Sequence, residues 1–249
     1  MIPEPDSGAV ITEYDDDIAV VTMDDGKANA MGLPLLDALA AAFDGVAASD
    51  ARAVALLGRE RFFSGGIDLR AYAHYDLEQR AEHARRLART LLQVFTFRRP
   101  VVAGITGHAV AGGALLALAA DVRLMARGEA RLTANEVSLG VDVPDFGLVI
   151  ARAALPHPHL LEMILHGRAL GPDEAHGMGL VEEVVEPAVL PDRVRARARE
   201  LGASVGHDAY EATKTRLRGA DAKRALEALE GDIDGFIHRV HELAEKHGA

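Results

Sequence analysis

The chain of 249 residues has no cysteine and no tryptophan, and only 4% of its residues are aromatic. The absence of cysteine excludes disulfide bonds and thiolate chemistry. Basic residues are in deficit, with 27 Lys and Arg against 38 Asp and Glu and a net charge of −11. Nucleic-acid binders need a basic face, so this balance argues against a nucleic-acid partner. A small anionic ligand is still compatible with it, because a local pocket can be basic.

The chain also lacks an uninterrupted apolar segment that would span a membrane. Residues 100–120 carry no formal charge, but prolines and glycines divide them into a strand, a turn and the start of a helix. Residues 1–6 lack the basic and apolar regions of a signal peptide. We therefore expect a cytoplasmic protein with no membrane partner. The histidines at 157, 159 and 166 have no metal-ligand spacing with a nearby acid, so no metal is expected.

Strand-like and helix-like patterns alternate along the first 200 residues. The strand-like runs are 9–12, 18–23, 53–57, 100–106, 122–125, 131–133 and 181–185, and the helical ones are 33–48, 78–97, the stretch from 112, 146–155, 160–166 and 172–177. This alternation predicts an α/β fold with buried parallel strands. The pattern after residue 188 is helical, and residues 222–246 are amphipathic. We place a boundary near residue 200, between a core (1–200) and a helical C-terminal segment (201–249).

Two glycine-bearing turns, Phe62–Leu69 and Gly107–Leu115, each follow a strand-like run. Glycines in the first turn allow positive φ or a close approach to a ligand. Gly112 opens a helix, whose free N–H groups favour negative charge. Side by side, the N–H groups of Ile67 and Gly112 would stabilise an oxyanion on one carbonyl oxygen, often the largest effect in acyl chemistry. Each turn alone also fits a purely structural role.

A third motif, Ala134–Gly140, contains Asn135 and Glu136. Apolar neighbours flank Glu136, and burial would raise the pKa of its carboxyl group into the range of a useful proton shuttle. A lone glutamate is more often solvated, so this interpretation depends on the two turns. Asp68, near the end of the first turn, can cap the following helix.

The three motifs, in this order and spacing, resemble those of the enoyl-CoA hydratase/isomerase (crotonase) superfamily. The matching segments are Asp24–Met31, Phe63–Leu69, Gly107–Leu118 with Asp121–Arg123, Asn135–Gly140 and Ala175–Val185. The resemblance implies a spiral of repeated ββα units and a coenzyme A thioester as substrate, with no permanently bound cofactor. It also implies self-association as a homotrimer or a dimer of trimers, through the helical C-terminal segment.

The resemblance further assigns roles by position. Ile67 and Gly112 match the two oxyanion donors, and the segment with Lys27, Ala28 and Ala30 matches the lining of the CoA nucleotide site. The other positions expected at the substrate are Ser64, Gly65, Gly66, Asp68, Leu69, Ala111, Leu115 and Asn135.

Leu115 departs from the pattern of the family's hydratases, which carry two glutamates. It occupies the position of the first glutamate, three residues after Gly112 and on the same helix face. Leucine cannot hold or activate water. The second glutamate matches Glu136. The family's 3,2-enoyl-CoA isomerases share this pattern, so we predict conversion of a 3-enoyl-CoA to the trans-2-enoyl-CoA with Glu136 as the proton shuttle.

Asp145 leaves alternatives open. It follows Pro144, where dienoyl-CoA isomerases and some dehalogenases of the superfamily use an aspartate, although a helix cap is its simpler role. Beside Glu136 it would be a second acid, and Asp142 is a weaker candidate of the same kind. The alternative functions are an enoyl-CoA hydratase, an acyl-CoA thioesterase and a non-catalytic acyl-CoA-binding protein.

Overall fold

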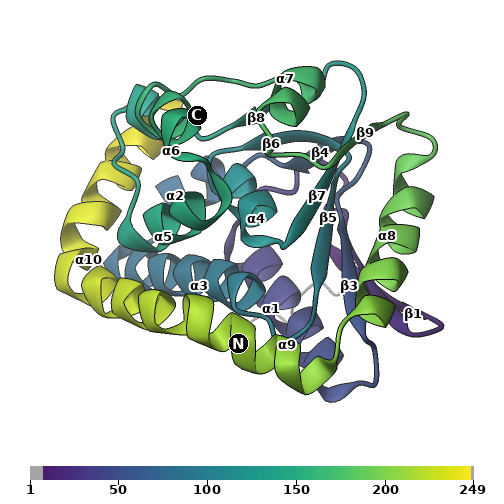
Figure 1. Cartoon of the computed structure of the whole chain (residues 1–249). Helices are drawn as coiled ribbons and strands as arrows, with labels where there is room; N and C mark the ends of the chain where they lie inside the picture. The colour runs from purple at the N-terminus through teal and green to yellow at the C-terminus, as the bar shows by residue number, and fades with distance from the viewer. Residues whose placement is uncertain (1–7, 248–249) are drawn as a thin grey trace.

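The computed structural model describes residues 8–247, which contain two sheets (Figure 1). The larger sheet has the order β1-β2-β3-β5-β7-β9, with strands Val10–Asp15, Ile18–Met23, Ala53–Leu57, Val101–Ile105, Val122–Ala126 and Glu183–Val185. The smaller sheet has the order β4-β6-β8, with strands Arg61–Ser64, Gly107–Val110 and Leu132–Thr133. Only β1 and β2 pair antiparallel among these strands. The predicted α/β class is confirmed.

Each successive pair of strands contributes one strand to each sheet. In the pairs β3–β4, β5–β6 and β7–β8, the first strand joins the larger sheet and the second joins the smaller one. Helices follow each strand pair: α1 (Leu33–Ala48), α2 (Leu69–Ala73) with α3 (Leu77–Phe95), α4 (Gly112–Ala119) and α5 (Asp145–Ala154). This is the spiral of ββα units that the resemblance implied. Because β4 and β6 are parallel neighbours, the glycine turns continue from the carboxyl ends of both strands at the same end of the smaller sheet.

The central strands β2, β3 and β5 of the larger sheet are buried on both faces, which explains why they read as apolar runs. Ile18 and Val20 of β2 pack with helix α8 (Leu190–Ser204), whereas Ala19 and Val21 belong to the core on the opposite face. Figure 1 shows α8 on one side of the sheet and α1, α3 and α4 on the other. Alternating residues of one strand therefore fill two separate cores.

The C-terminal helices pack on the core of their own chain. Helix α9 (His207–Lys214) and a π-helical turn (Thr215–Gly219) lead into α10 (Ala220–His247), which contacts α2, α3 and α5. Figure 1 shows α10 running alongside α3. The boundary expected near residue 200 lies inside α8, and the main core includes apolar side chains of α10. In the structure, residues 201–247 thus belong to the same packed body as the ββα units, and their role in self-association stays a prediction.

A buried ionic cluster fixes this C-terminal region to the larger sheet. Asp121, just before β7, lies 2.7 Å from Nζ of Lys214 and 2.9 Å from Nη1 of Arg218. The backbone N–H of Val101 also donates to the Asp121 carboxylate at 2.8 Å. Burial lowers the pKa of Lys214 to about 8, against the opposing effect of Asp121. The cluster therefore joins the end of α9 to the start of β5.

The remaining elements are short. They are the 3₁₀ turn Val137–Leu139, helix α6 (His157–Leu160), the π-helical turn Leu161–Leu165 and helix α7 (Pro172–Gly177). The helix expected over 160–166 is thus mostly a π-helical turn. Within residues 8–247, the helices are all too short or too polar to cross a bilayer. The expectation about residues 1–6 lies outside the described part of the chain.

Candidate functional site

The two glycine turns lie in contact with each other. A Cβ added to Gly66 would lie 2.8 Å from the carbonyl oxygen of Val110 and 3.4 Å from the backbone nitrogen of Gly112. A Cβ added to Gly113 would lie 2.3 Å from the carbonyl oxygen of Ser64. These positions require glycine because the backbones of the two turns approach too closely for a side chain. The contact brings Ile67 and Gly112, one from each turn, to the wall of a single cavity.

The second turn has a strained backbone. Ala111 has φ 50° and ψ −122°, a conformation that costs a non-glycine residue about 1–3 kcal/mol. Its N–H donates to the carbonyl of Thr133 at 2.8 Å, which holds it against β8. The next residue, Gly112, is the first residue of α4, so its N–H has no carbonyl partner within the helix. The turn thus places the N-terminal end of α4, with its partial positive charge, at the wall of the cavity.

The N–H of Ile67 is oriented by a bridge to Met31. The two residues pair as in a parallel sheet: the N–H of Met31 donates to the carbonyl of Gly66 at 2.7 Å, and the N–H of Asp68 points to the carbonyl of Met31 at 3.5 Å. Neighbouring peptide groups of an extended segment point in opposite directions. The N–H of Ile67 therefore points away from Met31. Ile67 and Gly112 thus line one cavity, and their role as oxyanion donors stays a prediction.

Glu136 follows β8 and lines the same cavity. Its Oε2 is buried and has no hydrogen-bond partner in the described part of the chain. Burial raises the pKa of Glu136 to about 7, partly opposed by a hydrogen bond to its own backbone. Asn135 also lines the cavity, and its Oδ1 is buried without a partner among residues 8–247. The predicted desolvation of Glu136 is thus present, and the two residues with an unpaired buried oxygen, Asn135 and Glu136, line the same cavity.

The rest of the cavity wall is mostly apolar. The cavity has a volume of about 100 Å³. Leu115 is 2% exposed and lines it, as expected from its place one helical turn after Gly112. Predicted residues Gly65, Leu69 and Ala111 also line it. The sequence did not indicate Leu87, Leu139 and Val141, nor three residues of α10: Phe236, Val240 and Leu243. Helix α10 therefore closes the apolar end of the cavity.

Asp145 does not join Glu136 at the cavity. It is exposed, begins α5, and lines a separate groove with Arg152 and Arg224. The next residue, Phe146, lines the cavity instead, because adjacent helical residues point in directions about 100° apart. Asp142 does reach the cavity rim, but it is exposed and its carboxylate pairs with Arg239. The possible second acid at Asp145 is therefore not beside the base. Asp145 is also not the residue that caps the helix, since Pro144 occupies that position.

Other predicted substrate residues lie behind the first turn. Ser64 is fully buried, and its hydroxyl accepts a hydrogen bond from the N–H of Gly66 at 3.2 Å. Asp68 caps α2 by accepting from the N–H of Ala71 at 3.0 Å, as expected. Neither side chain lines the cavity. They hold the turn in place.

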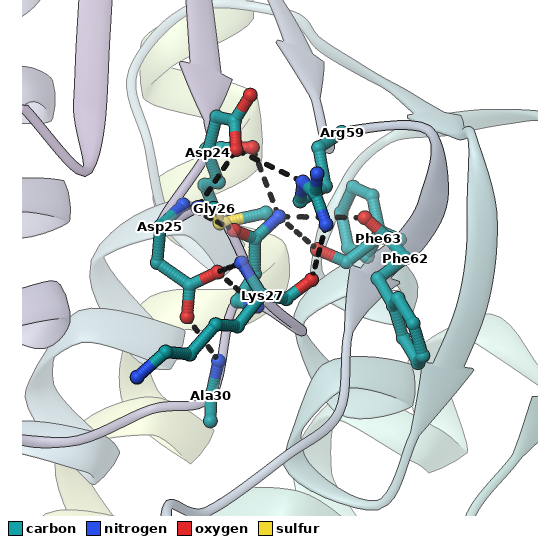
Figure 2. A network of polar contacts seen from close by, with 10 residues as sticks. Asp24, Asp25, Gly26, Lys27, Ala30, Arg59, Phe62 and Phe63 are labelled. Atoms are coloured by element: carbon teal, nitrogen blue, oxygen red, sulfur yellow. Dashed lines mark hydrogen bonds and ion pairs between the residues drawn. The ribbon is translucent and has the colours of Figure 1, made fainter.

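Lys27, Ala28 and Ala30 lie in the loop that follows β2, beside the first turn. The N–H of Gly65 donates to the carbonyl of Ala28 at 2.8 Å. Figure 2 shows the carboxylate of Asp25 beneath the loop, within hydrogen-bonding reach of the Lys27 and Ala30 N–H groups, while the Lys27 side chain extends away from the network. Lys27 is exposed. Its ammonium group is therefore accessible to an anionic ligand next to the turn.

His83 is a buried residue that the sequence did not indicate. Its Nε2 lies 2.7 Å from the carbonyl oxygen of Met31, so it donates as the Nε2–H tautomer. Its ring packs edge-on against Tyr72, with 5.2 Å between ring centroids. Burial lowers the pKa of His83, which keeps it neutral. Its signal in the sequence was one histidine on the apolar face of a helix, which has no specific meaning without the fold.

The site shows no arrangement of His, Cys, Asp or Glu side chains suited to a metal ion, and none occurs elsewhere in residues 8–247.

Comparison with known proteins agrees with the fold. The enoyl-CoA hydratase/isomerase family model matches residues 13–249. The chain belongs to the enoyl-CoA hydratase/isomerase family. A carnitinyl-CoA dehydratase of Salmonella paratyphi A is 35% identical over 187 residues, which are 74% of this chain and 70% of the relative.

Two solved structures from Mycobacterium tuberculosis are also similar. One, a probable enoyl-CoA hydratase EchA3, has a TM-score of 0.85 and 30% identity, and the match covers 96% of this chain and 98% of that one. The other, described as an enoyl-CoA isomerase, has a TM-score of 0.81 and 32% identity, with 92% and 98% covered. Both structures are of the same M. tuberculosis protein, which is named once as a hydratase and once as an isomerase, so family membership alone does not select the reaction.

Proposed function

We propose that this protein converts a 3-enoyl-CoA to the trans-2-enoyl-CoA. The observation that carries the proposal is the buried carboxylate of Glu136, whose Oε2 has no hydrogen-bond partner among the described residues, in the wall of an apolar cavity that Ile67 and Gly112 also line. Leu115 occupies the position of the first hydratase glutamate and is buried in the wall of that cavity. The cavity therefore offers one buried proton acceptor, since its other carboxylate, Asp142 at the rim, is exposed and paired with Arg239.

In the proposed reaction, the thioester oxygen accepts hydrogen bonds from the N–H groups of Ile67 and Gly112. The Glu136 carboxylate removes a proton from C2, and the electron pair of that C–H bond delocalises into the thioester as a dienolate. The two N–H groups stabilise the negative charge on its oxygen. The protonated Glu136 then gives the proton to C4, the double bond moves from C3–C4 to C2–C3, and the carboxylate is restored. Atoms and charge balance without a co-reactant.

A carboxyl pKa of about 7 suits both halves of this reaction. An efficient general base and acid has a pKa near the working pH, because it must first take up the proton and then release it. An ordinary solvated glutamate would be a weaker base for C2. The apolar wall that raises the pKa also excludes water, which disfavours hydration of the product.

Parallel incubations test the proposal. The protein is mixed with 3-hexenoyl-CoA, crotonyl-CoA or a saturated acyl-CoA, and conjugation, loss of conjugation and free thiol are measured. We expect conjugation of 3-hexenoyl-CoA as the main reaction. Faster loss of crotonyl-CoA conjugation would identify a hydratase, thiol release would identify a thioesterase, and binding without turnover would identify a non-catalytic protein.

A further inference from the structure

Asn29 is the centre of a buried network that joins the loop after β2 to the first glycine turn. Its side chain is fully buried. The amide Nδ2 donates to the carbonyl of Met23 at 2.9 Å and to that of Phe63 at 3.1 Å, with the Phe62 carbonyl at 3.3 Å. One side chain thus connects the end of β2 to β4, the strand that leads into the turn.

The same side chain also organises the loop itself. Its Oδ1 accepts from the N–H of Asp25 at 2.9 Å. Asp25 in return accepts from the N–H groups of Lys27 at 2.7 Å and Asn29 at 2.9 Å. Asn29 has φ 50°, which asparagine adopts more readily than most residues. Both ends of the loop are therefore fixed by this reciprocal pair of side chains.

A second relay runs from the backbone of Asn29 to the turn. The hydroxyl of Ser64 donates to the carbonyl of Asn29 at 2.7 Å and accepts from the N–H of Gly66 at 3.2 Å. Gly66 directly precedes Ile67. Because these groups are buried and satisfy one another, a shift of the loop would break several hydrogen bonds at once. We therefore expect the loop and the turn to move together and not independently of each other.

We propose that Asn29 is a positioning residue that couples occupancy of the loop at residues 24–30 to the orientation of the Ile67 N–H. The inference rests on the proposed function, and on the expectation that this loop, with the exposed Lys27, receives the nucleotide end of the CoA thioester. Binding energy from a remote part of a substrate raises kcat when it helps to hold the reacting centre. Nucleotide binding to the loop would thus restrict the orientation of the Ile67 N–H through the hydrogen bonds of Asn29 and Ser64.

The kinetic test compares a full CoA thioester with the same 3-hexenoyl group on pantetheine, which lacks the nucleotide. Asn29→Gly removes the side-chain hydrogen bonds of Asn29, and glycine adopts the positive φ at this position without strain. Ser64→Ala removes only the hydroxyl relay and guards against a folding failure of the first variant. Asp16→Gly is the matched control, since Asp16 has φ 54° in the exposed turn between β1 and β2.

In the wild type and Asp16→Gly, we expect kcat to be higher for the CoA thioester than for the pantetheine thioester. The advantage should be about tenfold, within the range typical of coupling between sites. In Asn29→Gly and Ser64→Ala the advantage should fall to about twofold or less, mainly through kcat for the CoA thioester. An unchanged kcat advantage in folded variants would overturn the proposal, and so would a change confined to KM.

Hydrogen exchange gives a readout that needs no turnover. Adenosine 3′,5′-bisphosphate is added, and amide exchange is measured in the turn that contains Gly66 and Ile67. We expect added protection there in the wild type and in Asp16→Gly, and none in Asn29→Gly. Absence of protection in the wild type, or equal protection in all three proteins, would refute the coupling. If the wild type shows protection but no isomerisation, the proposed reaction fails while the coupling stands.

Discussion

Gly66→Ala is the change that most directly disturbs the contact between the two turns. The new Cβ would lie 2.8 Å from the Val110 carbonyl oxygen and 3.2 Å from Cβ of Ala111. Both are tighter than ordinary contact, so the turns must separate by several tenths of an ångström. Gly66 also has φ +84°, and a left-handed backbone costs an L-residue about 1–2 kcal/mol. The separation moves the Ile67 N–H relative to that of Gly112.

Loss of one oxyanion donor lowers kcat by about 10²- to 10³-fold in other enzymes. Because Gly66→Ala displaces a donor without removing it, we expect a decrease in kcat of about 100-fold with 3-hexenoyl-CoA. Gly179→Ala is the matched control, because Gly179 has φ +74° and no heavy atom within 4 Å of an added Cβ. It should lose similar stability and keep its kcat.

The assay follows conjugation of 3-hexenoyl-CoA over a range of substrate concentrations, with the unfolding temperature of each variant measured in parallel. A Gly66→Ala protein that folds as well as Gly179→Ala but keeps kcat within about twofold of the wild type would refute the reasoning. Equal activity losses in both variants would refute it too, because backbone strain would then be the cause.

Three further results are expected. First, kcat/KM for 3-hexenoyl-CoA should fall as pH drops below about 7, because the base must be unprotonated and burial raises the pKa of Glu136 to about 7; a flat profile between pH 5 and 8 would contradict this. Second, a raised carboxyl pKa in the folded state means that Glu136 costs stability increasingly as pH rises from its ordinary value of 4.5 to 7. In chemical denaturation, Glu136→Gln should therefore be more stable than the wild type at pH 8, by up to about 3 kcal/mol, and lose this advantage near pH 4. Third, Lys214→Ala should lower the free energy of unfolding by about 3 kcal/mol, since it breaks the buried pair with Asp121. The control Asp173→Ala, which breaks an exposed pair with Arg127, should cost less than about 1 kcal/mol, and equal losses would contradict the assigned role of the cluster.

Local sequence signals predicted much of the fold. The helices expected at 33–48 and 172–177 coincide with α1 and α7. Each has a proline near its start, a signal that depends on neighbouring residues only. The strand expected at 53–57 coincides with β3 for a similar reason, since a short apolar run bounded by polar residues suits a buried strand.

Strand β6 was not predicted, because Gly107 read as part of a turn. A Cβ added to Gly107 would lie 1.9 Å from the backbone carbon of Arg61 in β4. This glycine is required by a strand distant in sequence, and single-sequence patterns do not contain that information. The close approach of Gly113 to Ser64 has the same origin.

For the site, the sequence identified four residues that line the cavity but only part of the rest of its wall. Ile67, Gly112, Leu115 and Glu136 meet at one cavity as predicted. The apolar face of α10 was visible as a helical repeat, but the repeat could not show that Phe236 and its neighbours close the cavity. The direction of Asp145 depended on the rotation of α5, which tertiary packing sets.

The most direct test of the account is the turnover of 3-hexenoyl-CoA by Glu136→Gln, measured together with the affinity for a saturated acyl-CoA. Glutamine has nearly the same size and cannot accept the C2 proton. Loss of a general base typically costs about 10²- to 10⁴-fold in rate. The account predicts that conjugation falls by at least about 10²-fold while acyl-CoA affinity is kept. Conjugation at the wild-type rate would show that Glu136 is not the base and would contradict the central claim.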